Sequence, residues 1–111
     1  MKDRYPTDAE LDKIKNWDFK LGFEFLVEYI RGIWWMPEWG LYVYPGREHL
    51  FKGRVTKLQL HTGGWSGNED IIEALEQNFS FWNLCFYKHI RGGHYWFQIR
   101  RSFWKPAVRA K

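Results

Sequence analysis

A chain of 111 residues has the length of one domain, here residues 1–111, and its single cysteine, Cys85, excludes an intrachain disulfide. Its charges are segregated: residues 1–78 hold all thirteen Asp and Glu beside ten Lys and Arg, whereas residues 79–111 hold seven Lys and Arg and no acid. No uninterrupted apolar run reaches the ~18 residues of a membrane span and no apolar leader is visible, so we expect a protein of the cytoplasm.

The N-terminal third predicts helices. Thr7 and Glu10 have the spacing of a capping box, so we expect a short helix to about Asn16. Residues 18–33 fit two patterns, because alternate positions are apolar, as in a half-buried strand, and the apolar residues also form a helical stripe. The length of this run favours a helix with Asp18 as its N-cap.

Two strands and a helix are predicted in the middle of the chain. Residues 39–46, WGLYVYPG, indicate a strand that ends in a Pro-Gly turn. Residues 54–62 alternate between two faces, and the outer face holds Lys57, Gln59 and His61. Residues 68–78 then predict an amphipathic helix, whose apolar side holds Ile71, Ile72, Leu75 and Phe79.

A β-hairpin is predicted near the C-terminus, where two β-rich runs flank Gly92-Gly93. If these glycines form the whole turn, one face of the hairpin holds Cys85, Tyr87, His89, Arg91, His94, Trp96, Gln98 and Arg100. The core face then holds Leu84, Phe86, Ile90, Tyr95, Phe97 and Ile99, with Lys88 and Arg101 as exceptions. Residues 102–111 would form a basic, flexible tail. The chain thus predicts an α+β fold: N-terminal helix or helices, a mostly antiparallel sheet of about four strands with one helix packed on it, and a C-terminal β-hairpin.

The first face of this hairpin combines cations with aromatic rings. Arginine pairs with phosphate in a fork geometry, and aromatic side chains on a sheet stack on bases. We therefore expect a nucleic acid or a nucleotide to bind through Tyr87, His89, Arg91, His94, Trp96 and Arg100. In the alternative, a helix covers this face and its aromatic residues belong to the core.

Tryptophans supply a second candidate surface. The chain has eight of them, and aromatic residues beside methionine are favoured at protein interfaces. A partner protein would bind through Trp34, Trp35, Trp39 and Trp65. The alternative is that the run IWWMPEWG is a helix end packed on a sheet.

The glycine-rich stretch TGGWSGNED lies between a predicted strand and a predicted helix, as phosphate loops do. It lacks the Walker and dinucleotide patterns, and Glu69 and Asp70 would repel a phosphate. Ser66 and Glu69 also have capping-box spacing, which would occupy the N–H groups of the helix start. We therefore expect a capped helix rather than a phosphate site.

No enzyme signature or cofactor motif is present. Ser66 lacks the spacing of a nucleophile elbow, and Cys85 is expected to be an inert buried thiol. A zinc site from Cys85, His89 and His94 lacks the usual ligand spacing, so we expect no metal and no cofactor. The acids Glu69, Asp70 and Glu73 are explained by their place in the first turns of a helix.

The string GGWSGNEDIIEALEQN, followed by FW and by RGGHY, resembles a group of small uncharacterised bacteriophage-encoded proteins over residues 58–97. The resemblance implies a protein made in the bacterial cytoplasm and carries no catalytic roles. It also implies a host or defence component as partner. The expected function is a small non-enzymatic binding protein whose partner is a host or phage protein. The alternative is a nucleic-acid or nucleotide binder, with a small enzyme as the third choice.

Overall fold

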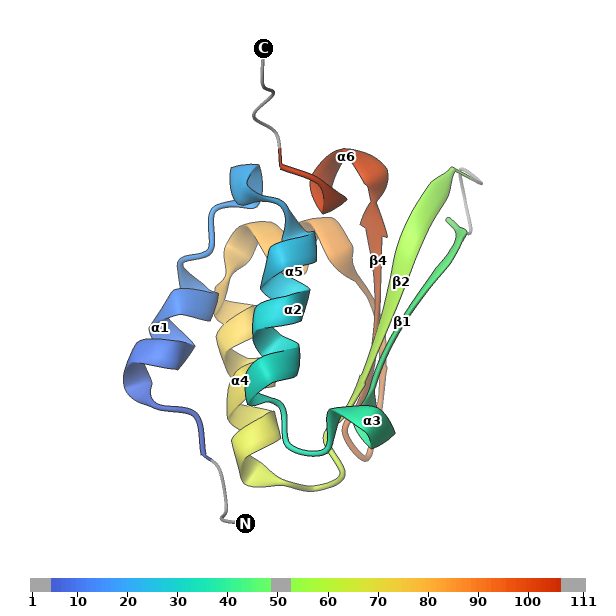
Figure 1. Ribbon diagram of the computed structural model, residues 1–111. Helices are drawn as coiled ribbons and strands as arrows, with labels where there is room; N and C mark the ends of the chain where they lie inside the picture. The colour runs from blue at the N-terminus through green and yellow to red at the C-terminus, as the bar shows by residue number, and fades with distance from the viewer. Residues whose placement is uncertain (1–4, 49–52, 107–111) are drawn as a thin grey trace.

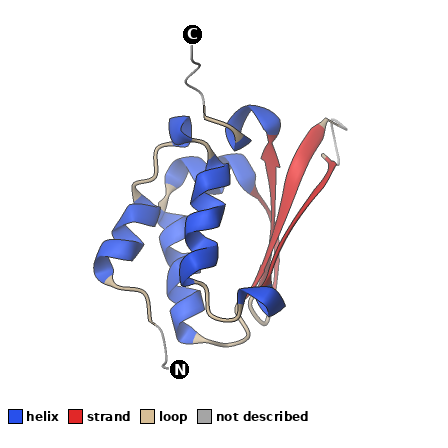
Figure 2. Ribbon diagram, viewed as in Figure 1, coloured by secondary structure: helices blue, strands red, loops and turns tan. Residues whose placement is uncertain are grey.

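Helices cover one face of a four-stranded antiparallel sheet in the computed structural model, which describes residues 5–48 and 53–106 (Figures 1 and 2). The strand order is β1-β2-β4-β3. The helical segments are α1 (Asp8–Lys15), η1 (Phe19–Leu21), α2 (Phe23–Ile33), α3 (Pro37–Gly40), α4 (Ser66–Gln77), α5 (Phe79–Cys85) and α6 (Arg101–Trp104). The strands are β1 (Leu41–Arg47), β2 (Arg54–His61), β3 (Phe86–Ile90) and β4 (His94–Arg100). The predicted α+β fold is confirmed.

The N-terminal predictions hold in their main points. Both bonds of the capping box between Thr7 and Glu10 are present at the start of α1. Residues 18–33 are helical, but in two pieces: Asp18 caps the short helix η1, and α2 begins only after Gly22. Gly22 has a φ of +89°, and a Cβ there would lie 2.8 Å from the backbone nitrogen of Pro106. This glycine therefore breaks the helix so that the C-terminal segment can pack against it.

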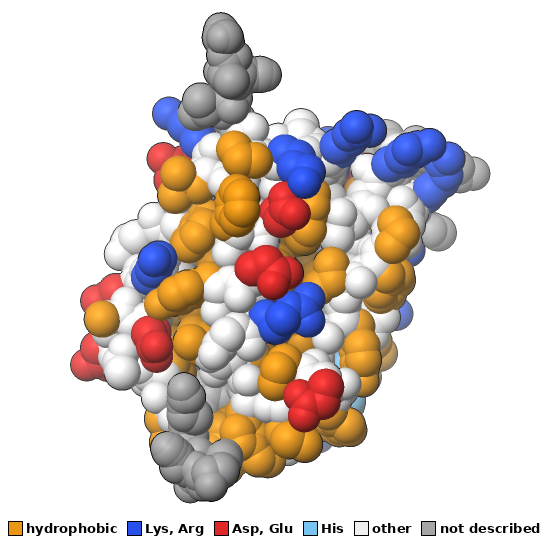
Figure 3. All heavy atoms as spheres, in the orientation of Figure 1, with side chains coloured by type: hydrophobic (Ala, Val, Ile, Leu, Met, Phe, Trp, Pro, Cys, Tyr) orange, Lys and Arg blue, Asp and Glu red, His pale blue; other side chains and the backbone are white. Residues whose placement is uncertain are grey.

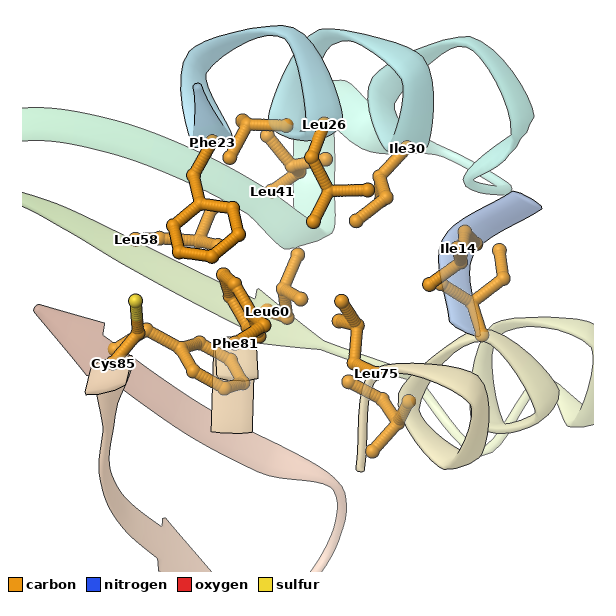
Figure 4. Close-up of a cluster of buried hydrophobic side chains, with 14 of the residues drawn as sticks. Ile14, Phe23, Leu26, Ile30, Leu41, Leu58, Leu60, Leu75, Phe81 and Cys85 are labelled. Carbon is orange, nitrogen blue, oxygen red and sulfur yellow. The ribbon is translucent and has the colours of Figure 1, made fainter. Parts of the chain in front are cut away.

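The hydrophobic core lies between the helices and the sheet (Figure 4). Apolar side chains from α2 and α5, such as Phe23 and Phe81, meet the inward residues of the strands, and these two rings pack edge to face at 5.0 Å. Phe81 also contacts Phe97 of β4. Cys85 is buried in the same cluster, and this burial raises the pKa of its thiol, as expected for an inert cysteine.

The prediction that Leu84 and Cys85 lie in the first hairpin strand is wrong, because both residues belong to the helix α5. Its N-cap is Asn78, whose side-chain oxygen accepts a hydrogen bond from the Phe81 N–H at 3.1 Å. The helix ends the run of inward residues early, so Leu84 is exposed rather than in the core. Phe79 is exposed as well, instead of lying on the apolar side of α4.

The predicted register of the hairpin is also wrong by one residue. Ile90 pairs with His94 and His89 with Tyr95, so the connection contains Arg91, Gly92 and Gly93. A shift by one residue transfers β3 side chains to the opposite face of the sheet. A bulge between Phe86 and Lys88 shifts the register once more, and Phe86 pairs with Phe97.

The glycine-rich stretch connects β2 to α4 and also contacts the hairpin turn. Thr62 donates its backbone N–H to the carbonyl of Gly93 at 2.9 Å, which ties the loop to the hairpin. The capping box predicted for Ser66 and Glu69 is wrong: Trp65 is the N-cap of α4 and makes no side-chain cap bond. The Glu69 carboxylate instead accepts a hydrogen bond from the Thr62 hydroxyl at 3.4 Å.

The predicted basic tail is in part structured. Arg101–Trp104 form the short helix α6, and Lys105 makes an ion pair with Glu24 of α2 at 2.8 Å. Residues 107–111 lie outside the described part of the chain. Within the described residues, no helix is long and apolar enough to cross a membrane.

Candidate functional site: the open face of the sheet

The sheet face away from the core carries aromatic, amide and basic side chains, and no described helix packs over it (Figure 1). We call this surface the open face. The pairing registers arrange its residues in rows across the strands. Its residues are Tyr42 and Tyr44 of β1, Lys57, Gln59 and His61 of β2, Lys88 and Ile90 of β3, and His94, Trp96, Gln98 and Arg100 of β4.

Trp96 lies near the centre of the open face. The Lys88 ammonium stands 4.8 Å from the centroid of its ring, and the His61 ring meets it edge to face at 5.7 Å. A shallow hollow of about 230 Å³ lies beside it, lined by Tyr44, Lys57, Tyr87, Lys88, Trp96, Phe97 and Gln98. The hollow therefore combines three amphipathic rings with two ammonium groups.

A chain of hydrogen bonds orders the polar side chains of three strands. The Gln59 amide nitrogen donates to the Tyr44 hydroxyl, and its oxygen lies 3.0 Å from Nε2 of His61. Nδ1 of His61 lies 2.8 Å from Nδ1 of His94. These contacts assign the proton of neutral His61 to Nε2 and that of His94 to Nδ1. Burial, and to a lesser degree the nearby His94, lowers the pKa of His61 from its usual 6.5, which favours this neutral form.

The charge of the sheet is one-sided. None of the four strands contains Asp or Glu, whereas together they contain Arg47, Arg54, Lys57, Lys88 and Arg100. Glu48, just after β1, lies at the rim and accepts a hydrogen bond from Arg100 at 3.0 Å. The other described acids belong to helices or to the connections between them, and among these Glu38 lies in α3, next to the end of the sheet. The open face is therefore a cationic surface, on which a polyanion would meet little repulsion.

The structure brings together only part of the predicted ligand site. His94, Trp96 and Arg100 share the open face, as expected. His89 does not, because the register shift places it beside Tyr95 on the other face, where the two rings stack at 4.3 Å. Arg91 lies in the exposed turn, and Tyr87 reaches the hollow from the bulge of β3. The alternative, in which a helix covers this face, does not hold for the described residues.

Several residues of the open face were missed as site residues, although their side of the strand was predicted. The alternation of β2 places Lys57, Gln59 and His61 outward, but the sequence does not say that β2 pairs with β4. Lys88 was an exception in the predicted core face. The observed register removes that conflict, because Lys88 pairs with Trp96 on the open face.

The four tryptophans of the predicted partner site do not form one surface. Trp34 is buried beside Gly40, as a helix end packed on a sheet would be. Trp35 and Trp65 stack on each other at 4.7 Å, and Tyr5 also stacks on Trp65, at 5.2 Å. Only Trp39 has more than half of its surface exposed, at 52%.

The other chemical candidates do not assemble. Cys85 is buried in the core while His94 lies on the open face, so the imagined zinc triad is not formed. Across residues 5–48 and 53–106, no three His, Cys, Asp or Glu side chains gather closely enough to hold a metal ion. Ser66 is the first residue of α4 and has no described histidine as a hydrogen-bond partner.

Comparison with known proteins adds no relative. A scan against models of protein families found no match, and neither did searches of curated proteins and of solved structures.

Proposed function

We propose that this protein binds single-stranded nucleic acid on the open face of its sheet. The observation that carries the proposal is the group of Trp96, Tyr44, Lys57 and Lys88 around one hollow of the open face, on a sheet whose strands contain no acid. Proteins that bind single strands combine a cationic surface with aromatic rings on which successive bases stack. This assignment reverses the order expected from the sequence, in which a protein partner came first.

The geometry suits a flexible strand better than a duplex. The aromatic rings lie on a sheet and form a hollow of about 230 Å³, which offers room for a splayed base. Bases in a duplex are already stacked on each other and cannot use such a surface. The Tyr44 hydroxyl accepts a hydrogen bond from Gln59, so its own hydrogen can be donated to a ligand. The Gln98 amide lines the same hollow and can also donate a hydrogen bond to a ligand.

The test is binding of fluorescent 12-nucleotide DNA and RNA strands of mixed sequence, followed by fluorescence polarisation at low salt. Trp96→Ala removes the central stacking ring and should weaken binding about tenfold, since stacking contributes ~1–3 kcal/mol per base. Tyr44→Ala should weaken it to a smaller degree. A duplex of the same sequence should bind more weakly than either single strand.

Phe79→Ala is the matched control, because Phe79 is an aromatic residue that is 79% exposed in α5, on the helical layer. It should leave the affinity unchanged. Failure of the wild-type protein to bind either strand would reject the proposal, and so would equal affinities of wild type and Trp96→Ala.

A protein partner remains the second candidate, and a specific group of exposed side chains favours it. Met36 and Trp39, at and within the α3 turn, and Tyr42, at the start of the edge strand β1, are each more than 40% exposed. Aromatic residues with methionine are favoured at interfaces. The resemblance of residues 58–97 to small phage-encoded proteins points to a bacterial host protein as this partner.

Affinity capture from a bacterial lysate with the wild type and the Trp39→Ala variant would test this second candidate. A genuine partner should be recovered by the wild type and by Phe79→Ala but lost with Trp39→Ala. Equal recovery by all three proteins would place the interface elsewhere.

A further inference from the structure

A second and separate hollow lies between the far ends of β1 and β2 and the C-terminal helix α6. It has a volume of about 520 Å³, within the usual range of small-molecule sites. Apolar surface comes from Pro45, Val55 and Trp104. The cationic lining residues are Arg47, Arg54, Arg101 and Lys105. We call it the α6 cleft. Figure 3 shows Lys and Arg side chains gathered along this end of the molecule.

The charges of the α6 cleft are only partly neutralised. No acid is among its lining residues. Lys105 is paired with Glu24, and in an adjoining hollow the only acid, Glu48, is bonded to Arg100. Arg54 and Arg101 line both hollows and form no ion pair with any carboxylate of residues 5–48 and 53–106. Of the three arginines that line the cleft, Arg54 and Arg101 therefore have no described carboxylate partner.

The wall that carries Trp104 is held in place from behind. The backbone of residues 104–106 packs so closely on Gly22 that a Cβ there would lie within 3.0 Å of three of its atoms. The ion pair between Lys105 and Glu24 ties the same segment to α2. The cleft is thus formed before a ligand arrives, which reduces the entropy lost on binding.

We propose that the α6 cleft binds a nucleoside phosphate, with the phosphate on Arg54 and Arg101 and the planar base on the apolar wall of Trp104. Guanidinium groups bind phosphate oxygens in a bidentate geometry, and an indole offers a stacking surface. Both halves of the ligand are needed, because an inorganic anion would leave the apolar wall unused and a nucleoside would leave the two cations unpaired. The ligand is either a free nucleotide or the phosphorylated end of a strand. This site does not depend on the open face.

Calorimetric titration of the full chain tests this inference, with ADP, adenosine and inorganic phosphate as probes. ADP should bind, whereas adenosine and inorganic phosphate should each bind at least tenfold more weakly. The variant with Arg54→Gln and Arg101→Gln should lose at least tenfold in ADP affinity, because it loses two charge-assisted contacts. Both side chains are exposed, so the variant should unfold at the same temperature as the wild type, which circular dichroism would verify.

Two comparisons separate the sources of the ligand and the two sites. A 5′-phosphorylated trinucleotide that binds more tightly than ADP would identify a strand end, and the reverse order would identify a free nucleotide. Trp96→Ala should leave ADP binding intact. A failure of strand binding on the open face can therefore be distinguished from a failure of ADP binding in the α6 cleft. The proposal is overturned if ADP does not bind, if adenosine or inorganic phosphate binds equally well, or if the double arginine variant retains full affinity.

Discussion

Asn68 is a buried side chain whose three hydrogen bonds join distant parts of the chain. Its side-chain oxygen accepts the Trp35 N–H at 2.8 Å, and its amide nitrogen donates to the carbonyls of Trp35 and Thr62 at 3.1 and 3.4 Å. The side chain is only 2% exposed, so water cannot replace these bonds easily. One residue of the glycine-rich stretch thereby fixes the segment that precedes α3.

Asn68→Ala should lower the free energy of unfolding by about 2–3 kcal/mol, because it leaves a buried N–H and two carbonyls without their partner. Urea denaturation measures the change. Asn83→Ala is the control: the Asn83 amide also donates to a backbone carbonyl, that of Phe79, but at an exposed position. Its effect should stay below ~0.5 kcal/mol. Equal losses in the two variants would contradict the role given to Asn68.

His61 makes stability depend on pH. Its pKa in the folded protein is lowered, chiefly by burial, so the unfolded chain binds a proton more readily than the folded one. The contribution of neutral His61 is therefore complete above its ordinary pKa of 6.5 and is lost as the pH falls below that value. Urea denaturation at pH 7.5 and pH 5.8 should show lower stability at the acid pH for the wild type. His61→Gln should show a smaller decrease, and an identical decrease would contradict this assignment.

At the scale of elements, the β3–β4 hairpin is positioned by Gly93. Its φ is +85°, a backbone conformation that residues with a side chain rarely adopt. A Cβ at this position would lie 2.1 Å from the Thr62 hydroxyl oxygen. Its carbonyl also accepts the Thr62 N–H. The hairpin turn is thus pressed against the glycine-rich stretch.

Gly93→Ala should lower the free energy of unfolding by about 2–4 kcal/mol, from the strained backbone and from the overlap with Thr62. Gly64→Ala separates the two causes: Gly64 also has a positive φ, +76°, but a Cβ there meets nothing within 4 Å. This control should lose only about 1 kcal/mol. Thermal and urea unfolding would measure both variants, and equal losses would show that contact with Thr62 is unimportant.

The hairpin also shows what the sequence could and could not predict. The alternation of β2 and β4 was sufficient to place Lys57 and Trp96 outward, because that pattern is local. The three-residue connection places Gly93 in contact with Thr62, 31 positions away, and no local pattern reveals such a contact. The helix α5 did have a local signal, since Asn78 is a favoured N-cap residue, but the aromatic run after it resembled a strand.

At the scale of the whole molecule, charge follows the layers. The described acids lie in the helical layer or at its connections, except for Glu48 at the end of β1, whereas the strands carry only cations. Helix α1 holds Lys13 and Lys15, but it also holds three acids and lies on the far side of the core from the sheet (Figure 1). A bound nucleic-acid strand should therefore interact electrostatically with the cations of the sheet and only weakly with those of α1.

The salt dependence of single-strand affinity tests whether the cations of the sheet, rather than those of α1, attract the strand. Binding of a single strand releases counter-ions, and the logarithm of the affinity falls by ~0.7 per decade of salt for each phosphate contact. Replacing both Lys57 and Lys88 with glutamine removes two cations of the open face and should reduce this slope by ~1.4. Replacing both Lys13 and Lys15 with glutamine changes the net charge by the same amount from the other layer. It should leave the slope nearly unchanged, and equal changes in the two variants would mean that net charge, not the open face, attracts the strand.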